Sequence, residues 1–273
     1  MELNLNQPAQ DRQASLLAAR DVALNGLTTI EYSRKRAFKL CYWILRWGVT
    51  SPTLLDKVAR SKRRGIGKKL VGKNLLKQSK TSGGGFSKGT PRHILTLTKI
   101  GLAFLLESGL DGDTDYKLID PTKVREDKLR HDFIAQLFTF ENLEDGNIVD
   151  FIPEFLNKES HKANTKIADV IWIQVDGTRI GLEVELTPKF SRSLDQFIYG
   201  VIMALLDKKV DRFLLLTDKQ SIIDRYTEAM NSKSVPIWFK NKQGRWTKKD
   251  EPFVIPSFIK NEERFVCVYQ SNL

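Results

Sequence analysis

Three carboxylates stand at a spacing that could support chemistry. Asp169 precedes the apolar run 170–173, and Glu183 and Glu185 lie within the alternating stretch 179–186. Side chains two positions apart in a strand share a face, so the two glutamates are expected on one side of their strand. If the two stretches form a hairpin, Asp169 lies beside Glu183. Three neighbouring carboxylates repel one another unless a divalent cation or a basic group neutralises their charge.

The elements expected around these carboxylates alternate between strand and helix. Periodicity predicts a helix over residues 124–140, a strand over 148–155 and the hairpin over 170–186. A helix over 191–206 and a buried apolar strand over 212–217 follow. The last predicted elements are a helix over 221–230 and a strand over 235–239. The chain from residue 244 onward is predicted as appended β structure. This order predicts an α/β (α+β) fold with a mixed sheet.

A helix, then a hairpin with Asp and Glu-x-Glu, then a crossover helix to a parallel strand resembles the core of the PD-(D/E)XK nucleases. Phosphodiester hydrolysis needs a hard cation that polarises the phosphoryl oxygen and activates water. Asp169 and Glu183 are the expected ligands of Mg²⁺ (or Mn²⁺), together with the Val184 carbonyl. Glu185 stands where that family has Lys, and is expected as a third ligand or a proton acceptor. Lys189 is expected to return an ammonium group to the site.

The segments 168–172 and 181–189 further resemble the MobC-type plasmid mobilisation relaxases and the related replication-relaxation proteins. This resemblance covers most of the chain. It implies that the three carboxylates are catalytic and that His131 matches the family's helix histidine, as a proton donor to the leaving oxygen or a phosphate ligand. It also implies metal-dependent nicking of one DNA strand at a plasmid transfer origin, beside an accessory mobilisation protein and a coupling ATPase.

Positive charge is concentrated in one block of the sequence. The net charge is +11, and residues 31–100 alone hold 18 Lys and Arg against 2 Asp and Glu. A local excess of this size is typical of a module that binds a polyanion. A basic surface that is merely solvated is the alternative interpretation.

The basic block is predicted to fold as a winged helix-turn-helix, with three helices followed by a strand, a glycine-tipped loop and a returning strand. The three helices are predicted over residues 33–47, 52–60 and 66–76. The returning strand is predicted over 94–98, and a closing helix over 99–106. The third helix would enter the major groove of double-stranded DNA. The expected DNA contacts lie before, on and after it: Arg60, Lys62, Arg63, Arg64, Lys68, Lys69, Lys73, Asn74, Lys80, Lys88 and Arg92.

Four segments follow from these patterns. Residues 1–30 form an N-terminal arm, with a short helix expected over 15–24, and residues 31–109 form the winged-helix domain. Residues 110–122 form an acidic, turn-rich linker, and residues 123–273 form the nuclease-like domain. No apolar run reaches transmembrane length and no signal-peptide pattern is present. Cys41 and Cys267 lack zinc-site spacing and are expected as free thiols. These features favour a cytoplasmic protein without membrane insertion.

Three functions remain open from the sequence. The first is a sequence-specific nicking relaxase that uses metal-assisted water attack. The second is a transposon-type or restriction-type endonuclease that cuts both strands as a dimer. The third is a DNA-binding replication or transcription regulator with a degenerate nuclease fold, which the absence of the usual Lys keeps open. Tyr199 and Tyr226 lie on predicted helices and are expected to be structural rather than nucleophilic.

Overall fold

The structure is a computed structural model that describes residues 26–62, 64–84, 89–112, 116–157 and 165–271. The helix predicted over 15–24, and the predicted DNA contacts Arg63 and Lys88, lie outside these residues. Within the described part of the chain, no helix combines the length and apolar content needed to cross a bilayer.

Helices and strands alternate along the chain, in agreement with the predicted α/β (α+β) class. The N-terminal half contains α2 (Thr29–Trp47), α3 (Pro52–Val58), α4 (Ile66–Gly72), β1 (Leu76–Lys80), β2 (His93–Leu97) and α5 (Lys99–Glu107). Two short 3-10 turns follow, η1 (Pro121–Lys123) and η2 (Glu126–Lys128). The C-terminal half contains α6 (Leu129–Glu144), β3 (Asp150–Pro153), α7 (Glu154–Asn157), β4 (Val170–Ile173), β5 (Arg179–Val184), α8 (Ser191–Leu206), β6 (Arg212–Thr217), α9 (Gln220–Asn231), β7 (Ser234–Val235), β8 (Trp238–Lys240), β9 (Trp246–Lys248), β10 (Phe253–Val254), α10 (Ser257–Asn261) and β11 (Phe265–Tyr269).

Local capping explains where α2 begins. The Thr28 hydroxyl accepts a hydrogen bond from Glu31 N at 3.2 Å, and the Glu31 carboxylate accepts one from Thr28 N at 2.8 Å. This reciprocal capping box starts the helix four residues before the predicted position, inside the expected N-terminal arm. The helix ends at Gly48, whose φ of 78° suits glycine.

The third helix is shorter than predicted. α4 ends at Gly72, and Asn74 adopts a left-handed conformation with φ 59°. The chain then enters β1, where Leu76 lies opposite Leu97 of β2 in an antiparallel pair. Lys73 and Asn74 therefore lie beyond the helix on which they were expected, because strand pairing replaces its last turn.

The C-terminal half is built on a mixed five-stranded sheet in the order β11-β6-β5-β4-β3. The predicted hairpin forms, with Val170 of β4 opposite Leu182 of β5. β6 runs parallel to β5 on one side and to β11 on the other. The expectation that the C-terminal tail is appended β structure was wrong for β11, because this strand completes the main sheet and covers an edge of the apolar β6. The strand predicted over 235–239 is divided at Pro236 into β7 and β8, consistent with the missing N–H of proline.

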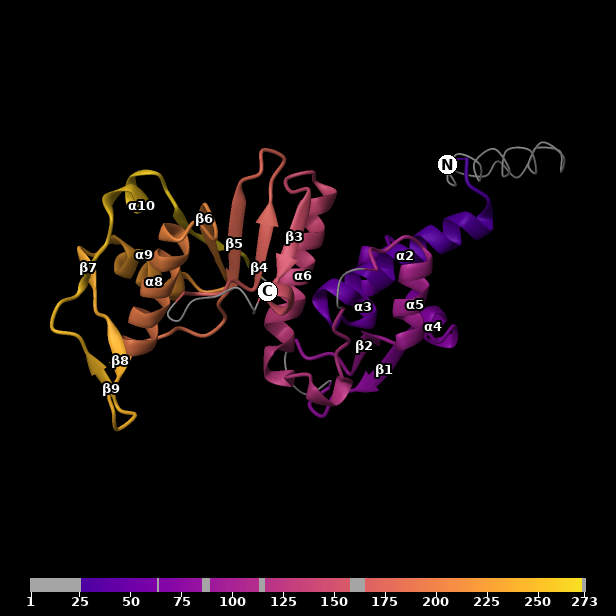
Figure 1. The fold of residues 1–273 in the computed structure, drawn as a ribbon, viewed down its shortest axis with the longest axis horizontal. Helices are drawn as coiled ribbons and strands as arrows, with labels where there is room; N and C mark the ends of the chain where they lie inside the picture. The colour runs from indigo at the N-terminus through magenta and orange to yellow at the C-terminus, as the bar shows by residue number, and fades with distance from the viewer. Residues whose placement is uncertain (1–25, 63, 85–88, 113–115, 158–164, 272–273) are drawn as a thin grey trace.

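Helices lie on both sides of the sheet (Figure 1), and two hydrophobic clusters form between the sheet and these helices. One contains Trp43 and Trp47 of α2 together with Phe151 and Trp172 of the sheet, and it also includes residues of α6. The other is formed mainly by α8, α9 and residues of β6. Several apolar side chains of the predicted linker pack against the first cluster, namely Leu110, Tyr116 and Leu118. The N-terminal helices and the sheet therefore share one core.

Candidate active site and basic surface

Asp169 and Glu183 meet where β4 begins and β5 ends. The pairing of Val170 with Leu182 places the residues next to them, Asp169 and Glu183, in register. Asp169 Oδ2 accepts a hydrogen bond from Val184 N at 2.8 Å. Glu183 is buried, with only 5% of the residue's surface exposed. The structure thus brings these two carboxylates together, and their catalytic role stays a prediction.

Lys166 is the basic group that faces this pair. Its Nζ lies 2.8 Å from Glu183 Oε2. Burial and the charge of Asp169 raise the pKa of Glu183 to about 7, against the opposing effect of Lys166. Burial also raises the pKa of Asp169, again opposed by Lys166. The pKa of Lys166 is raised because the attraction of both carboxylates outweighs its own burial.

The sequence-based site did not include Lys166, although this residue stands only three positions before Asp169. Its place in the structure depends on a contact between distant segments. Lys166 N donates a hydrogen bond to Gly200 O of α8 at 3.0 Å, and a Cβ at Gly200 would lie 3.0 Å from atoms of Lys166. A glycine on α8 therefore lets the segment before β4 approach the helix closely.

Glu185 has partners other than the Asp169–Glu183 pair. Its Oε2 forms an ion pair with Lys189 Nζ and accepts a hydrogen bond from Tyr226 Oη at 3.0 Å. Lys189 N donates to Tyr226 Oη at 3.3 Å, and the Tyr226 side chain is fully buried. Lys189 precedes α8 instead of starting it. Burial lowers the pKa of Lys189 and raises the pKa of Tyr226, so the tyrosine is held as a neutral donor.

His131 lies in the first turn of α6 and reaches the end of β5. Its Nδ1 lies 2.9 Å from Val184 O. A carbonyl oxygen only accepts, so Nδ1 carries the proton in this contact and Nε2 is the other ring nitrogen. The Val184 carbonyl, expected as a metal ligand, is therefore engaged by His131.

The predicted site residues open onto three separate hollows. Glu183 lines a cavity of about 320 Å³ together with Lys166, Lys189 and Trp238. Asp169 lines one of about 260 Å³, with Glu154 and Asp132 among its other walls. His131 lines one of about 350 Å³ beside Arg130 and Thr187. The three side chains do not converge on one cavity.

The number of carboxylates available to a metal ion is small in this site. Among the described residues, no group of three or more His, Cys, Asp and Glu side chains is placed to hold a metal ion. Glu185 is engaged by Lys189 and Tyr226, which leaves Asp169 and Glu183 as two candidate ligands. Mg²⁺ is commonly bound through one or two carboxylates, with water and substrate phosphate oxygens completing its shell. Asp169 and Glu183 supply the number of carboxylates in this pattern without Glu185 as a third ligand, although the two residues line different cavities.

The predicted DNA contacts that the structure describes are all exposed. They occupy the α3–α4 connection, α4, the turn after α4 and the two ends of the β1–β2 loop: Arg60, Lys62, Arg64, Lys68, Lys69, Lys73, Asn74, Lys80 and Arg92. Arg60 also forms an ion pair with Glu144 of α6. The described start of this loop contacts η2, because the Glu126 carboxylate accepts from Ser82 N at 2.8 Å and Gly83 N at 3.1 Å. DNA binding by these residues stays a prediction.

Comparisons of the chain with protein-family models, with curated proteins and with solved structures find no match. Two groups of side chains are therefore the basis for a functional proposal. One is the pair formed by the partly buried Asp169 and the buried Glu183, with Lys166 against Glu183. The other is the exposed basic surface of the N-terminal half.

Proposed function

We propose that the chain is a sequence-specific DNA-nicking enzyme of the relaxase type, which hydrolyses one strand at a plasmid transfer origin with a divalent metal. The observation that carries the proposal is the pairing of the partly buried Asp169 with the buried Glu183 at adjoining strand ends, with Lys166 Nζ 2.8 Å from Glu183 Oε2. The element order α6-β3-α7-β4-β5-α8-β6 supports a PD-(D/E)XK-like core, in which carboxylates at such strand ends serve hydrolysis.

Each residue of the cluster has a role in this proposal. Asp169 and Glu183 hold Mg²⁺ or Mn²⁺, which polarises the phosphoryl oxygen and lowers the pKa of the attacking water. Lys166 stabilises the negative charge that develops on the scissile phosphate. Buried Glu185 and partly exposed Lys189 form a supporting ion pair beside it. In its imidazolium form His131 would donate the Nε2 proton to the leaving oxygen, while its Nδ1–H stays hydrogen-bonded to Val184 O; the neutral ring has no proton on Nε2.

The N-terminal half supplies DNA binding in this proposal. Three helices followed by a two-stranded hairpin support a winged helix-turn-helix, with Lys68 and Lys69 of α4 directed to the major groove or to phosphates. The partner is the double-stranded DNA of the transfer origin. An accessory mobilisation protein and a coupling ATPase are further proposed partners, on the resemblance to relaxases.

A non-catalytic regulator is the second candidate, and a specific observation favours it. The carboxylates of the cluster already have basic partners within the chain, Glu183 with Lys166 and Glu185 with Lys189. Such a cluster is neutralised without a metal ion. In this case the winged helix would bind DNA as a replication or transcription regulator, and the nuclease-like half would be degenerate.

A plasmid assay separates the candidates. Purified protein is incubated with a supercoiled plasmid that carries its native mobilisation region, with Mg²⁺, Mn²⁺ or EDTA, and the products are run before and after protease treatment. We expect open circles only with metal, and equally without protease. Linear products would indicate an endonuclease that cuts both strands. Open circles seen only after protease would indicate a covalent tyrosine adduct.

Matched carboxylate variants test the site itself. Asp169→Ala and Glu183→Ala should abolish nicking while leaving DNA affinity nearly unchanged. The control is Asp176→Ala, which removes an exposed carboxylate from the turn of the same hairpin and should nick normally. Full nicking by Asp169→Ala would refute the assignment. Tight specific binding by the unmodified protein, without any cleavage, would favour the regulator.

A further inference from the structure

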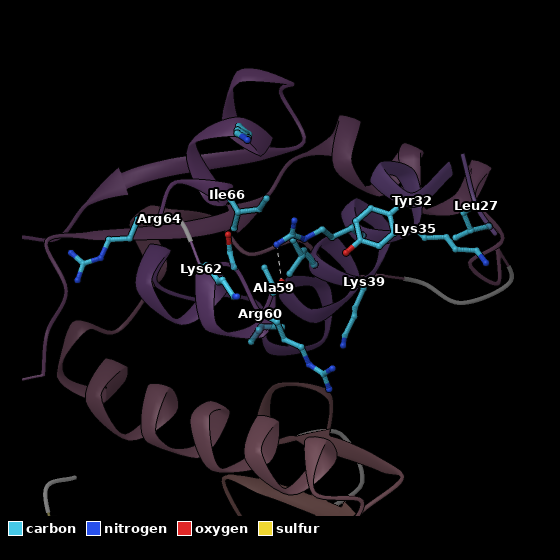
Figure 2. Close-up of a pocket in the computed structure, with 14 residues that line it drawn as sticks. Leu27, Tyr32, Lys35, Lys39, Ala59, Arg60, Lys62, Arg64 and Ile66 are labelled. Carbon is cyan, nitrogen blue, oxygen red and sulfur yellow. Dashed lines mark hydrogen bonds between the residues drawn. The ribbon is translucent and has the colours of Figure 1, made fainter. Parts of the chain in front are cut away.

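A groove of about 830 Å³ lies between α2 and the α3–α4 connection (Figure 2). Its first wall is the face of α2 that carries Lys35, Arg36 and Lys39. Arg36 is held in place because its guanidinium donates a hydrogen bond to Ala59 O at 2.8 Å. Lys35 and Lys39 are exposed, so their ammonium groups are available to a ligand in the groove.

The opposite wall is also basic. It is formed by Arg60, Lys62 and Arg64 of the α3–α4 connection and by Lys69 of α4. Figure 2 shows Lys39 of α2 and Arg60 of the connection extending in the same direction, toward α6, where both lie near Glu144, and Lys62 also lines the groove. No acidic side chain is among the described residues that line it. Two segments that are separate in the sequence therefore present only positive charge to one concavity.

The charges on the two walls are only partly compensated. Glu144 of α6 forms an ion pair with Arg60 and lies 4.0 Å from Lys39. Within the described part of the chain, Lys62, Arg64 and Lys69 form no ion pair with a carboxylate. Partial desolvation of the otherwise exposed Lys39 side chain lowers its pKa, and repulsion from Arg60 lowers it further. An anionic ligand would relieve this repulsion.

The groove also has an apolar and aromatic part. Leu40 and Val58 line it and are nearly fully buried, which gives the groove a fixed floor between the charged walls. Tyr32 also lines it, with 38% of its surface exposed. An exposed aromatic ring beside a basic groove is the combination by which proteins bind unpaired bases, since the phosphates follow the charges and a base stacks on the ring.

We propose that this groove binds a single-stranded nucleic-acid segment, with its phosphates between the two basic walls and a base stacked on Tyr32. A single strand fits because it can enter a concavity and contact both walls, whereas a duplex presents a convex surface. The groove adds Lys35, Lys39 and Tyr32 to the DNA contacts expected around α4. The proposed function would supply such a segment from the nicked strand, but binding itself requires neither metal nor cleavage.

Binding is measured on the full chain in EDTA, so that failure of nicking cannot be mistaken for failure of the groove. The probes are a fluorescent single-stranded oligonucleotide of mixed sequence, the same oligonucleotide as a duplex, and a poly-glutamate peptide. Fluorescence anisotropy is recorded over a series of salt concentrations. We expect the single strand to bind and the Lys35→Ala/Lys39→Ala double variant to bind it more weakly. Loss of two phosphate contacts should reduce the slope of log Kobs against log salt by about 1.4.

A control variant removes the same charge elsewhere. Lys242→Ala/Lys249→Ala changes two exposed lysines of the C-terminal half and should leave the slope unchanged. Tyr32→Ala should weaken single-strand binding by about tenfold, and Tyr32→Phe should retain it because the stacking ring remains.

Three results would overturn the proposal. One is an equal loss of single-strand binding in both double variants, which would reflect net charge alone. Another is unchanged single-strand affinity in Lys35→Ala/Lys39→Ala. The third is a poly-glutamate affinity equal to that of the oligonucleotide and unchanged in the Tyr32→Ala variant. This result would identify an acidic peptide as the occupant.

Discussion

Two lysines flank the candidate site, and each contacts a different carboxylate. Lys166 faces Glu183, whereas Lys189 pairs with Glu185. Lys189 could be proposed from the sequence because it follows the Glu-x-Glu strand closely. Lys166 could not, because its position depends on the close approach to Gly200, a contact across α8 that no local pattern encodes.

The two lysines should therefore differ in their effect on nicking. Lys166→Met should lower the single-turnover rate by about 10²–10³-fold, the usual effect of removing a group that stabilises transition-state charge. Lys189→Met should cause a smaller loss, because its Nζ is engaged by Glu185 and acts through that residue. DNA affinity should be similar in both variants. The reverse order of rates would contradict the role given to Lys166.

Glu183 should also make stability depend on pH in the metal-free protein. Its pKa is about 7 in the folded chain, against an ordinary value of 4.5. Between these values the folded state holds a proton that the unfolded state has lost. The free energy of unfolding should therefore fall as the pH rises through this window. Asp169, whose pKa is also raised by burial, contributes in the same direction.

Urea unfolding in EDTA at several pH values from about 4.5 to 7 tests this effect. Glu183→Gln does not titrate, so its free energy of unfolding should fall less steeply than that of the unmodified protein. Asp176→Asn is the control, because hydrogen bonds from Thr178 lower the pKa of Asp176 and keep its titration below the window. Equal slopes in the Glu183→Gln variant and the unmodified protein would show that Glu183 does not titrate there.

At the scale of single elements, local sequence patterns predicted the bounds of helices and strands whose ends depend on local apolar spacing. The amphipathic helix α8 and the apolar strand β6 have the predicted bounds, because their apolar spacing matches the faces they bury. The end of α4 and the partner of β11 depend on pairing between distant segments, Leu76 with Leu97 and Phe265 with Phe213. Such pairing is not visible in the local sequence.

A buried amide joins the N-terminal helices to α6. Gln136 Oε1 accepts from Thr50 Oγ1 at 2.8 Å and from Trp43 Nε1 at 3.2 Å, and Gln136 Nε2 donates to Val49 O at 2.8 Å. Gln136 is fully buried, so water cannot readily replace these bonds. The amide thus satisfies polar groups of both α2 and the chain that follows it.

Gln136→Ala should therefore destabilise the chain. Leaving buried donors without a partner costs about 1–3 kcal/mol, so the free energy of unfolding in urea should fall by that amount or more. Glu141→Ala, an exposed change on the same helix, should stay within about 0.5 kcal/mol of the unmodified protein. Similar effects of the two changes would indicate that the Gln136 bonds add little to stability.

At the scale of the whole molecule, composition located the basic block but not its packing. Charge and glycine content separated the N-terminal half from the rest of the sequence. The structure joins the halves through one hydrophobic cluster and through Glu126, which holds Ser82 and Gly83 of the β1–β2 loop. The sequence of the predicted linker did not indicate that its apolar side chains pack against this cluster, because they are scattered among acidic and turn-forming residues.

The shared cluster leads us to expect one cooperative unfolding transition for both halves. Trp43 packs against Phe151 with ring centroids 5.2 Å apart, so opening either half exposes apolar surface of the other. In native-state hydrogen exchange, the most protected amides of α3 and β6 should report the same free energy of opening. Phe151→Ala should lower both values together, by about 3–5 kcal/mol. Separate values for the two elements, with only one changed in Phe151→Ala, would show that the halves unfold independently.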